Sequence, residues 1–576
     1  NVITTLYKEE VIMKNIDKLK KILVDTLNIK NIDEITDEMG PDDIKDWDSL
    51  AHVELVTALE EKFEINLDVI DISRMYTIGD IKKILKNMNF TDYVFEKSKN
   101  SQNIAVIDNG EISYSEIYRG VCNIAYLLQK RNYSKKDSVL VISDNSTFFI
   151  KTYFGIMKNN SICVPVNPSM DKRDILYITK ILNINLAFCQ EKYKTEIKKL
   201  FGRNVELYTE KNIDEKQSDP KFEIDVDIKK DIALIMFTSG STSKPKGVML
   251  THYNLIYNTN SIIEYLNLTE RDRIEVVLPF YYCYGTSLLN THFRCSGSLV
   301  INNRFMFPQT VIDNINKYNC TGFAGVPTTY QILLRMTDLK DSKFPSLRYV
   351  TQAGGKLPKI FVSELYKVLK DVDIYIMYGQ TEATARLSYL PPEHIMDKLG
   401  SIGKGIPGTE LMVLNKKDMP VKTGEVGEIA ARGGNIMKGY FNDEEETKKV
   451  IRNGILYTGD IAVKDEDGYI FIVSREKNII KCAGNRISPG EIENIISCIH
   501  EVVECAVIGI EDEILGEAIK AFIVLNHSNK DIDDKYIVEY CSKRLPRYKV
   551  PKYVEFLTTL PKNSSGKVLF KDLRNM

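Results

Sequence analysis

The pattern of hydrophobic and polar positions divides the chain into regions of different character. In residues 14–88 the apolar side chains recur at helical spacing, first in IDKLKKILVDTL and again in DSLAHVELVTALEEKF. In the second run Leu50, Val53, Val56 and Leu59 are expected to form one buried stripe. A Thr-x-x-Asp capping signal opens a further helix, TIGDIKKILKNM. This region is therefore predicted to be a small all-α unit.

The remainder of the chain has a mixed pattern. Residues 89–103 are polar and lack clear periodicity, which predicts a short linker. In residues 104–474, β-branched runs such as DSVLVISD, SICVPV and IALIMFT alternate with helical patterns, as is typical of an α/β domain. Residues 475–576 contain the strands CAVIGI and IKAFIVLN and predict a smaller α+β unit. The chain is thus predicted to be multidomain.

Composition narrows the classes of function. The chain has 576 residues, and at roughly 150 residues per domain this length predicts three or four units. A net charge of -2 provides no polybasic surface, so neither nucleic acid nor an anionic membrane is an expected partner. No apolar run of about 18 residues and no signal-peptide pattern is present. The 10 cysteines are scattered without CxxC pairs, which predicts reduced thiols in a cytoplasmic protein.

A run of hydroxyls, glycines and lysines, TSGSTSKPKG, follows the apolar segment IALIMF. Glycines let backbone N–H groups approach a ligand, hydroxyls donate hydrogen bonds and lysine supplies positive charge, so the run suits phosphate. The fifth residue after Gly240 is Pro245, where a Walker-type loop needs glycine. This spacing disfavours a Walker-type NTPase. A run of this composition, taken alone, is also typical of a surface turn.

Ser49 lies at the start of an amphipathic helix, within DDIKDWDSLAHVEL. A serine at this position is also a common helix cap. In its small acidic helical setting, the region resembles an acyl carrier protein, whose Asp-Ser-Leu serine receives 4′-phosphopantetheine. The resemblance covers roughly residues 14–88 and implies a four-helix carrier bundle with Ser49 as the attachment site. It also implies an acidic docking face, a phosphopantetheinyl transferase and a downstream enzyme that uses the acyl thioester.

From about residue 104 to the C-terminus, the chain resembles the adenylate-forming superfamily of acyl-CoA synthetases, peptide-synthetase adenylation domains and beetle luciferase. The resemblance rests on motifs in a fixed order: TSGSTSKPKG, TQAGGKLP, YIMYGQTEAT, YTGD, REKNIIKCAGN and LPKNSSGK. It implies a large α/β domain over 104–474 and a small mobile domain over 475–576. It also implies that ATP and Mg²⁺ bind.

The same resemblance assigns the nucleotide-binding positions. The phosphate loop would hold the ATP β- and γ-phosphates through Thr238, Ser239, Gly240, Ser241, Thr242 and Lys246. Thr381 would contact the α-phosphate, and Glu382 would help to bind Mg²⁺, which prefers oxygen ligands. The adenine turn would be Ala353, Gly354 and Gly355, although the family usually has proline where Lys356 stands. Tyr378, Asp460 and Arg475 complete the nucleotide site, with Asp460 accepting the ribose hydroxyls.

Three lysines are assigned in the small domain. Lys477 would be the hinge about which this domain turns between two half-reactions, and Lys481 would face the site in the thioester-forming state. Lys567 occupies the position of the catalytic lysine, whose charge would orient the carboxylate and the α-phosphate. Without the other motifs, Lys477 and Lys567 would each be interpreted as a solvated surface residue.

The acid substrate is predicted from the segment that begins at Phe280. Amino-acid-activating relatives place an aspartate where Tyr281 stands, and a buried ammonium without such a partner would be costly. Tyr282 replaces a histidine of many acid-activating relatives, and Gly325 in FAGVPTTY is expected to form another pocket wall. The acid is therefore predicted to be a fatty acid, or alternatively an aryl acid.

Together these assignments predict an AMP-forming acid–thiol ligase. It would activate a carboxylic acid with ATP and transfer the acyl group to the phosphopantetheine thiol on Ser49. One alternative is an acyl-CoA ligase that uses free CoA. The other is a non-catalytic carrier scaffold with an inactive ligase fold.

Overall fold

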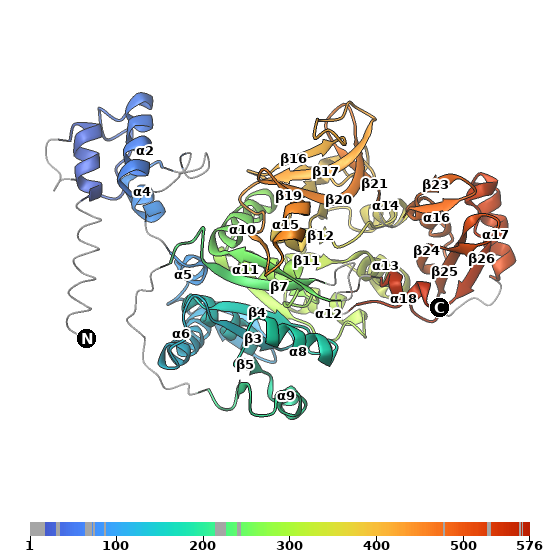
Figure 1. Ribbon diagram of the computed structural model, residues 1–576, viewed down its shortest axis with the longest axis horizontal. Coiled ribbons are helices and arrows are strands. Elements are labelled where there is room, and N and C mark those ends of the chain that lie inside the picture. Colours follow the sequence, from blue (N-terminus) through green and yellow to red (C-terminus); the bar gives the residue numbers. More distant parts are fainter. Residues whose placement is uncertain are drawn as a thin grey trace. The chain divides into compact units, whose positions relative to one another are not determined.

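The computed structural model describes residues 18–29, 35–63, 72, 75–85, 88–213, 226–238, 244–475, 479–526, 532–563, 566 and 568–576. The chain forms two compact units, residues 1–88 and residues 89–576, and each is described by itself (Figure 1). None of the helices in these ranges is both long enough and apolar enough to cross a membrane.

The described part of the first unit is helical. Residues 18–27 form a helix, followed by α2 (Ser49–Phe63) and α4 (Ile78–Leu85). Their buried side chains share one small core, which includes Leu23, Trp47, Leu55, Leu59 and Ile81. The predicted cap of α4 is confirmed, because Thr77 Oγ1 accepts a hydrogen bond of 3.1 Å from the Asp80 backbone N–H. The four-helix arrangement stays a prediction.

The buried face of α2 differs from the predicted stripe. Leu50 and Val53 are 69% and 60% exposed, whereas Leu55 and Leu59 are fully buried and Ala51 is nearly so. Residues spaced by three drift around a helix of 3.6 residues per turn, while positions 51, 55 and 59 stay on one side. The prediction was therefore wrong about Leu50 and Val53, which leave an apolar patch on the surface beside Ser49.

The second unit contains two large sheets. One has the strand order β18-β8-β7-β4-β3-β5-β6, with bounds β3 (Ser138–Ile142), β4 (Ile162–Val166), β5 (Leu186–Cys189), β6 (Glu206–Tyr208), β7 (Ile232–Thr238), β8 (Lys246–Thr251) and β18 (Gly439–Tyr440). The other has the order β15-β14-β13-β12-β11-β9-β10-β1-β2, with bounds β1 (Ile104–Ile107), β2 (Glu111–Ser113), β9 (Arg273–Val276), β10 (Ser298–Ile301), β11 (Gly322–Gly325), β12 (Tyr349–Gln352), β13 (Asp373–Tyr378), β14 (Ser388–Leu390) and β15 (Lys404–Gly405). The runs of hydrophobic strand residues are buried on both faces, as in parallel sheets covered by helices.

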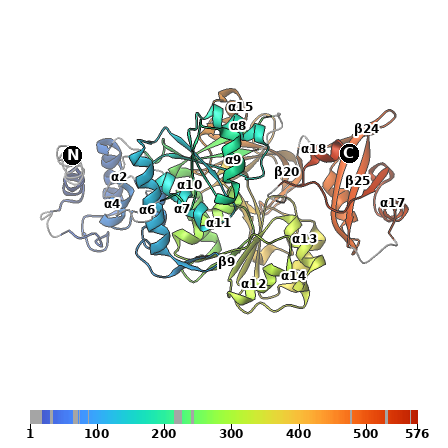
Figure 2. The ribbon, with the colours of Figure 1, turned by 90° about the horizontal axis from the view of Figure 1, so that it is seen from below.

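Helices lie between and outside these sheets (Figure 2). One core cluster combines side chains of both sheets with α6 (Tyr114–Lys130), α7 (Thr147–Lys158) and α11 (Cys283–Arg294), which places these helices between the sheets. α10 (His252–Leu266) packs beside α11. The outer faces are covered by α8 (Lys172–Ile181) and α9 (Lys194–Phe201) on one side, and by α12 (Gln309–Lys317), α13 (Pro327–Met336) and α14 (Lys359–Val368) on the other.

Two smaller sheets follow along the chain. The first contains β16 (Glu410–Leu414), β17 (Val426–Arg432), β19 (Ile451–Arg452), β20 (Ile455–Lys464) and β21 (Ile470–Arg475), all antiparallel. The C-terminal sheet contains β22 (Ile480–Cys482), β23 (Asn485–Ile487), β24 (Val502–Asp512), β25 (Gly516–Leu525) and β26 (Tyr553–Phe556), with α16 (Pro489–Ile496), α17 (Asp534–Ser542) and α18 (Phe570–Arg574). The predicted sequence of an α/β domain and a small α+β domain is confirmed.

The predicted linker over 89–103 is wrong in its first half. Residues Phe90–Phe95 form α5, and Phe90 and Phe95 are buried in the core between the two large sheets. The Phe90 backbone N–H donates to His252 Nδ1 at 3.0 Å, which ties this segment to α10. Six residues are too few to show helical periodicity, so the buried aromatic contacts could not be predicted from the pattern.

Glu275 on β9 is a buried carboxyl within the core. Its Oε1 accepts hydrogen bonds from Asn302 Nδ2 at 2.8 Å and Asn314 Nδ2 at 3.1 Å, and in the described part of the chain its Oε2 has no partner. Burial raises the pKa of this carboxyl from 4.5 to about 8. Between these two pH values the unfolded chain binds fewer protons than the folded one, so the free energy of unfolding falls as the pH rises.

We therefore expect Glu275→Gln to stabilise the protein increasingly as the pH rises. Glutamine does not ionise, so the difference in melting temperature between variant and wild type should be larger at about pH 8.5 than at about pH 5. Thermal melts at both pH values measure it. Glu513→Gln, at an exposed position, serves as the control. A difference that does not grow with pH would contradict the raised pKa.

Candidate active site

A short turn after β13 carries a threonine and a carboxylate. The chain leaves β13 at Tyr378 and forms a 3₁₀ turn over Thr381–Ala383. Thr381 Oγ1 lies 3.5 Å from Cys283 Sγ at the start of α11. Glu382 Oε1 accepts a hydrogen bond of 2.8 Å from the Tyr440 hydroxyl, and its backbone C=O accepts one from the Met437 N–H. Both predicted site residues are thus held at the carboxyl end of a strand, where α/β sheets bind ligands.

A second carboxylate is held by two partners from different strands. Asp460 Oδ2 accepts a hydrogen bond of 2.7 Å from the Tyr378 hydroxyl, and Oδ1 accepts one of 3.1 Å from Arg475 Nε. The register of β20 and β21 pairs Asp460 directly with Arg475. Burial, and next the negative charge of Asp460, raise the pKa of Tyr378, so this phenol stays protonated and donates. The structure brings these three predicted residues together.

The predicted adenine turn follows β12. Gly354 has a φ of +85°, a conformation that glycine adopts without strain. Gln352 Nε2 donates to the Gly355 carbonyl at 2.9 Å, and the Ala353 N–H donates to the carbonyl of Gly325, the predicted pocket wall. The turn is therefore fixed against the end of β11.

Lys356, which replaces the expected proline, reaches away from this turn. Its Nζ donates to the Ile472 carbonyl on β21 at 3.1 Å. Burial, and next the positive charge of Lys359, lower the pKa of Lys356. The lysine thus connects the adenine turn to the strand that ends in Arg475.

The predicted phosphate loop connects two antiparallel strands, because Thr238 at the end of β7 pairs with Lys246 at the start of β8. Ser239, Gly240, Ser241 and Thr242 lie outside the described residues. Lys246 Nζ is 2.7 Å from Glu446 Oε1 and 5.3 Å from the centre of the Tyr440 ring. Since the Tyr440 hydroxyl also donates to Glu382, one tyrosine links the predicted phosphate-binding lysine with the predicted metal-binding carboxylate.

Tyr440 and Glu446 were not found by the sequence reasoning. Tyr440 follows Gly439 in a polar run of the sequence. A glycine–aromatic pair in such a run could have identified Tyr440 as a candidate site residue. Glu446 lies in the first turn of α15 (Glu444–Val450), where an acidic residue is explained by the helix dipole alone. Burial, and next the charge of Glu382, raise the pKa of Tyr440 and keep it a donor.

The structure describes one of the three lysines predicted in the small domain. Lys477 and Lys567 lie outside the described residues. Gly566, directly before Lys567, accepts a hydrogen bond of 3.1 Å from Thr328 Oγ1 through its carbonyl. Lys481 is exposed on β22, and Gly484 follows with a φ of +77°. The chain next to Lys567 therefore contacts the start of α13, just beyond Gly325.

The predicted acid-binding segment leads into α11. The rings of Tyr281 and Tyr282 are partly exposed, with their centres 5.0 Å apart. The Tyr284 hydroxyl is 2.8 Å from Thr351 Oγ1 on β12. Arg386 is buried with its guanidinium carbon 4.8 Å from the centre of the Tyr284 ring. Burial raises the pKa of the Cys283 thiol, and the positive charge of Arg386 opposes this rise.

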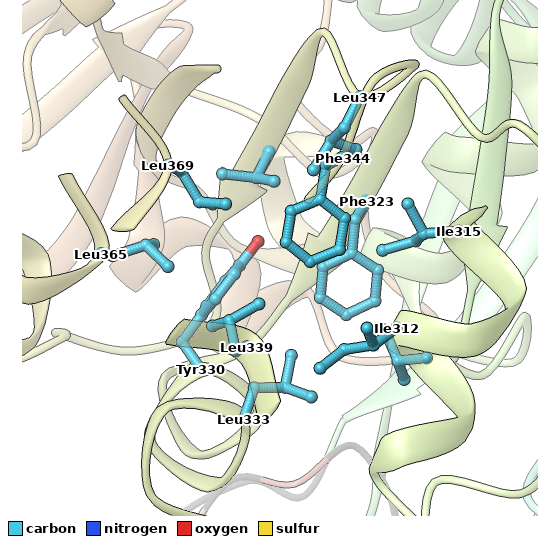
Figure 3. A pocket seen from close by; sticks show the side chains of 12 residues that line it. Ile312, Ile315, Phe323, Tyr330, Leu333, Leu339, Phe344, Leu347, Leu365 and Leu369 are labelled. Atoms are coloured by element: carbon cyan, nitrogen blue, oxygen red, sulfur yellow. The ribbon is translucent and has the colours of Figure 1, made fainter. Parts of the chain in front are cut away.

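A separate, small apolar pocket lies within the core under α12, α13 and α14 (Figure 3). Its lining consists of aliphatic and aromatic side chains, and the Tyr330 oxygen is the polar atom that Figure 3 shows there. The Tyr330 hydroxyl donates to the Thr351 carbonyl at 2.7 Å. With no charged or nucleophilic group in its lining, this cavity is a packing feature and not a reaction site.

The two-sheet fold with these strand-end side chains defines an adenylate-forming ligase. Residues 95–441 match the family model of the AMP-binding enzyme, and residues 491–567 match that of the AMP-binding enzyme C-terminal domain. The chain belongs to this family of AMP-binding enzymes. The predicted class of AMP-forming acid–thiol ligase is confirmed.

Relatives of this chain span most of its length. A feruloyl-CoA synthase from Amycolatopsis is 28% identical over 85% of this chain and 99% of its own. The 4-coumarate–CoA ligase 3 of Arabidopsis thaliana is 31% identical over 80% of this chain and 86% of its own. The o-succinylbenzoate CoA synthetase of Bacillus subtilis, solved with ATP and a magnesium ion, has a TM-score of 0.74 and 26% identity over 85% of this chain and 98% of its own. Its membership of this family, together with these relatives, shows that this chain activates an acid in an ATP-dependent reaction.

Proposed function

We propose that this enzyme converts a carboxylic acid without a charged amine to acyl-AMP and transfers the acyl group to a phosphopantetheine thiol carried on Ser49. The observation that carries the first half-reaction is the convergence of Thr381, Glu382, Tyr378 and Asp460 at the end of β13. There the acid carboxylate would attack the ATP α-phosphorus and pyrophosphate would leave.

Each described polar group has a place in this reaction. The Asp460 carboxylate, oriented by Tyr378 and Arg475, would accept the ribose hydroxyls, and the glycine turn at 354 and 355 would lie against the adenine. Thr381 would donate to the α-phosphate. Glu382 fits a magnesium site because Mg²⁺ often takes one protein carboxylate together with substrate phosphates. Bound Mg²⁺ would offset the phosphate charge during attack.

The transfer to a carrier is supported by the surface around Ser49. The Asp48 carboxylate accepts the backbone N–H groups of Leu50 and Ala51, both at 2.9 Å, so Asp48 caps α2. Ser49 is exposed and is not required as the cap. Leu50 and Val53, both exposed, provide apolar contacts for a partner enzyme beside the acidic residues of α2. A carrier domain would present its serine in this way.

The nature of the acid is supported by Tyr281 and by the relatives. Tyr281 occupies the position where an amino-acid-activating relative has its carboxylate. Two relatives are a feruloyl-CoA synthase and a 4-coumarate–CoA ligase, and another is a long-chain-fatty-acid–CoA ligase of Bacillus subtilis. An uncharged aryl or fatty acid as the substrate of this enzyme agrees with these relatives.

Intact-mass spectrometry tests the proposal. The pantetheinylated protein, given ATP and a library of acids, should gain the mass of one acyl group in an ATP-dependent reaction. If the protein exchanges pyrophosphate with an acid but transfers the acyl group to free CoA only, the acyl-CoA ligase alternative is correct. If it does neither, the scaffold alternative is correct.

We expect Asp460→Asn to weaken ATP binding. The variant would replace charge-assisted hydrogen bonds to ribose by neutral ones, and at ~1.5–3 kcal/mol for such bonds the KM for ATP should rise about 10- to 100-fold. Pyrophosphate exchange at varied ATP measures this. Asp465→Asn, which removes the charge of one of the two carboxylate partners of Lys398, serves as the control. An unchanged KM would remove Asp460 from the nucleotide site.

A further inference from the structure

Lys246 is a largely buried cation at the base of the predicted phosphate loop. It begins β8 and pairs with Thr238, the last residue of β7, so the two residues flank the loop. Its side chain is 13% exposed. An ammonium group that is taken out of water needs a partner of opposite charge, because its lost hydration is otherwise not replaced. Lys246 therefore needs an anion beside it whether or not a nucleotide is bound.

In the structure this anion belongs to the protein itself. Glu446 Oε1, on α15, lies 2.7 Å from Lys246 Nζ, and the Glu446 side chain is 27% exposed. Among the residues that the structure describes, Glu446 is the carboxylate that forms an ion pair with Lys246. Hydrogen bonds from Lys246, and next from Lys449, lower the pKa of Glu446 and keep this carboxylate charged.

Glu446 can release Lys246 without losing every partner of its own. Its Oε2 also pairs with Lys449 Nζ at 3.0 Å, one turn further along α15. The Glu446 backbone N–H donates to Asp443 Oδ1 at 3.1 Å, so the helix is capped independently of Lys246. Opening the ion pair with Lys246 therefore leaves Glu446 with a counter-ion and its backbone with a fixed position.

Lys246 likewise has a second contact that does not depend on Glu446. Its Nζ lies 5.3 Å from the centre of the Tyr440 ring, and the Tyr440 hydroxyl donates to Glu382 at 2.8 Å. Because a cation is attracted to the face of an aromatic ring, this contact holds the ammonium on the side of Tyr440. The ammonium thus stays near the predicted metal-binding carboxylate, where the nucleotide phosphates are expected.

We propose that Glu446 takes the place of the ATP β- and γ-phosphates on Lys246 while the nucleotide is absent. ATP must then open the Lys246–Glu446 ion pair as it binds, so the charge of Glu446 lowers the affinity for ATP. AMP lacks these two phosphates and does not compete with Glu446, so its affinity does not depend on this carboxylate. The inference rests on the proposed function and adds a residue that sets the nucleotide affinity of the same site.

Nucleotide binding by Glu446→Gln tests this inference. The Kd of ATP with Mg²⁺, measured by calorimetry without an acid, should fall roughly fivefold, which is the upper end of the range for exposed ion pairs. The Kd of AMP should equal that of the wild type. The ratio of the AMP Kd to the ATP Kd should therefore rise roughly fivefold, and the unchanged AMP Kd shows that the variant is folded.

Two further proteins control for the loss of one negative charge. Glu444→Gln removes the same charge from the same helix, but the Glu444 side chain is 90% exposed and its partner is Lys448, at 3.5 Å. This variant should bind both nucleotides like the wild type. Lys246→Met removes the other half of the ion pair and should weaken ATP binding by itself. Adding Glu446→Gln to it should change the ratio no further, because the cycle isolates the pair.

Thermal melts give a second readout that does not depend on activity. Without nucleotide, Glu446→Gln should melt at a lower temperature than the wild type, because Lys246 then lacks its counter-ion. The difference should shrink as ATP approaches saturation, since the phosphates then pair with Lys246 in both proteins.

The outcomes are distinct. An ATP Kd that rises or stays unchanged in Glu446→Gln overturns the inference, and so does an equal gain in AMP affinity or the same gain in Glu444→Gln. Each of these results leaves the proposed function intact, because the wild type still binds ATP. A wild-type protein that binds no ATP in the presence of Mg²⁺ overturns the proposed function itself, and the inference with it.

Discussion

Lys567→Ala is expected to slow acyl-AMP formation by roughly 10²- to 10³-fold, the magnitude for losing one preorganised transition-state group. The lysine would orient the acid carboxylate and the α-phosphate as charge develops between them. Its neighbour Gly566 contacts Thr328 at the start of α13, close in sequence to Gly325 of the proposed acid-binding wall. Thioester formation from supplied acyl-AMP should be much less affected, because the phosphoryl transfer has then already taken place.

Both half-reactions should be measured on the same preparations. Pyrophosphate exchange reports the first, and release of AMP from added acyl-AMP reports the second. Lys571→Ala, an exposed lysine in α18, is the matched control and should behave like the wild type. Equal losses in both half-reactions would show that Lys567 is a structural residue.

Ser49→Ala is expected to abolish covalent loading of the chain. Without the hydroxyl there is no attachment point for phosphopantetheine, so the protein should show neither the pantetheine mass nor the acyl mass after treatment with a phosphopantetheinyl transferase, ATP and acid. Pyrophosphate exchange should remain at the wild-type rate, because the adenylating residues belong to the unit formed by residues 89–576.

Thr57→Ala provides the control for this variant. Thr57 is another exposed hydroxyl on α2, and it donates to the Val53 carbonyl within the helix. Its replacement should leave loading complete. If the Ser49→Ala protein still accepted phosphopantetheine, the carrier interpretation of residues 14–88 would be lost. If it produced acyl-CoA as fast as the wild type, free CoA would be the physiological acceptor.

The adenylating class could be predicted from the sequence because its chemistry depends on contiguous motifs. TSGSTSKPKG, YGQTEAT and YTGD each place predicted phosphate- or sugar-binding groups within a few residues, and the fixed order of these motifs distinguishes them from surface turns without knowledge of the fold. Local patterns likewise predicted the Thr77 cap, which depends on a residue and its neighbour three positions on.

Features that depend on contacts between distant segments were not accessible in this way. α5 is recognised as part of the large unit only through His252 and the aromatic core, and the polar composition of its surroundings concealed it. The exposure of Leu50 and Val53 depended on which side of α2 met the other helices. Tyr440 joins Lys246 to Glu382 because β18 pairs with β8, although the two strands are far apart in the sequence.

By itself the sequence determined the family and the order of the predicted reactive groups, because the predicted phosphate loop and the threonine–glutamate pair are each encoded in adjacent residues. Only the tertiary structure decided how those groups combine. The Tyr378–Asp460–Arg475 cluster arises where three separate strands come together. Hydrogen bonding and burial act over a few ångströms in space, and proximity along the chain does not predict which distant side chains come within that range.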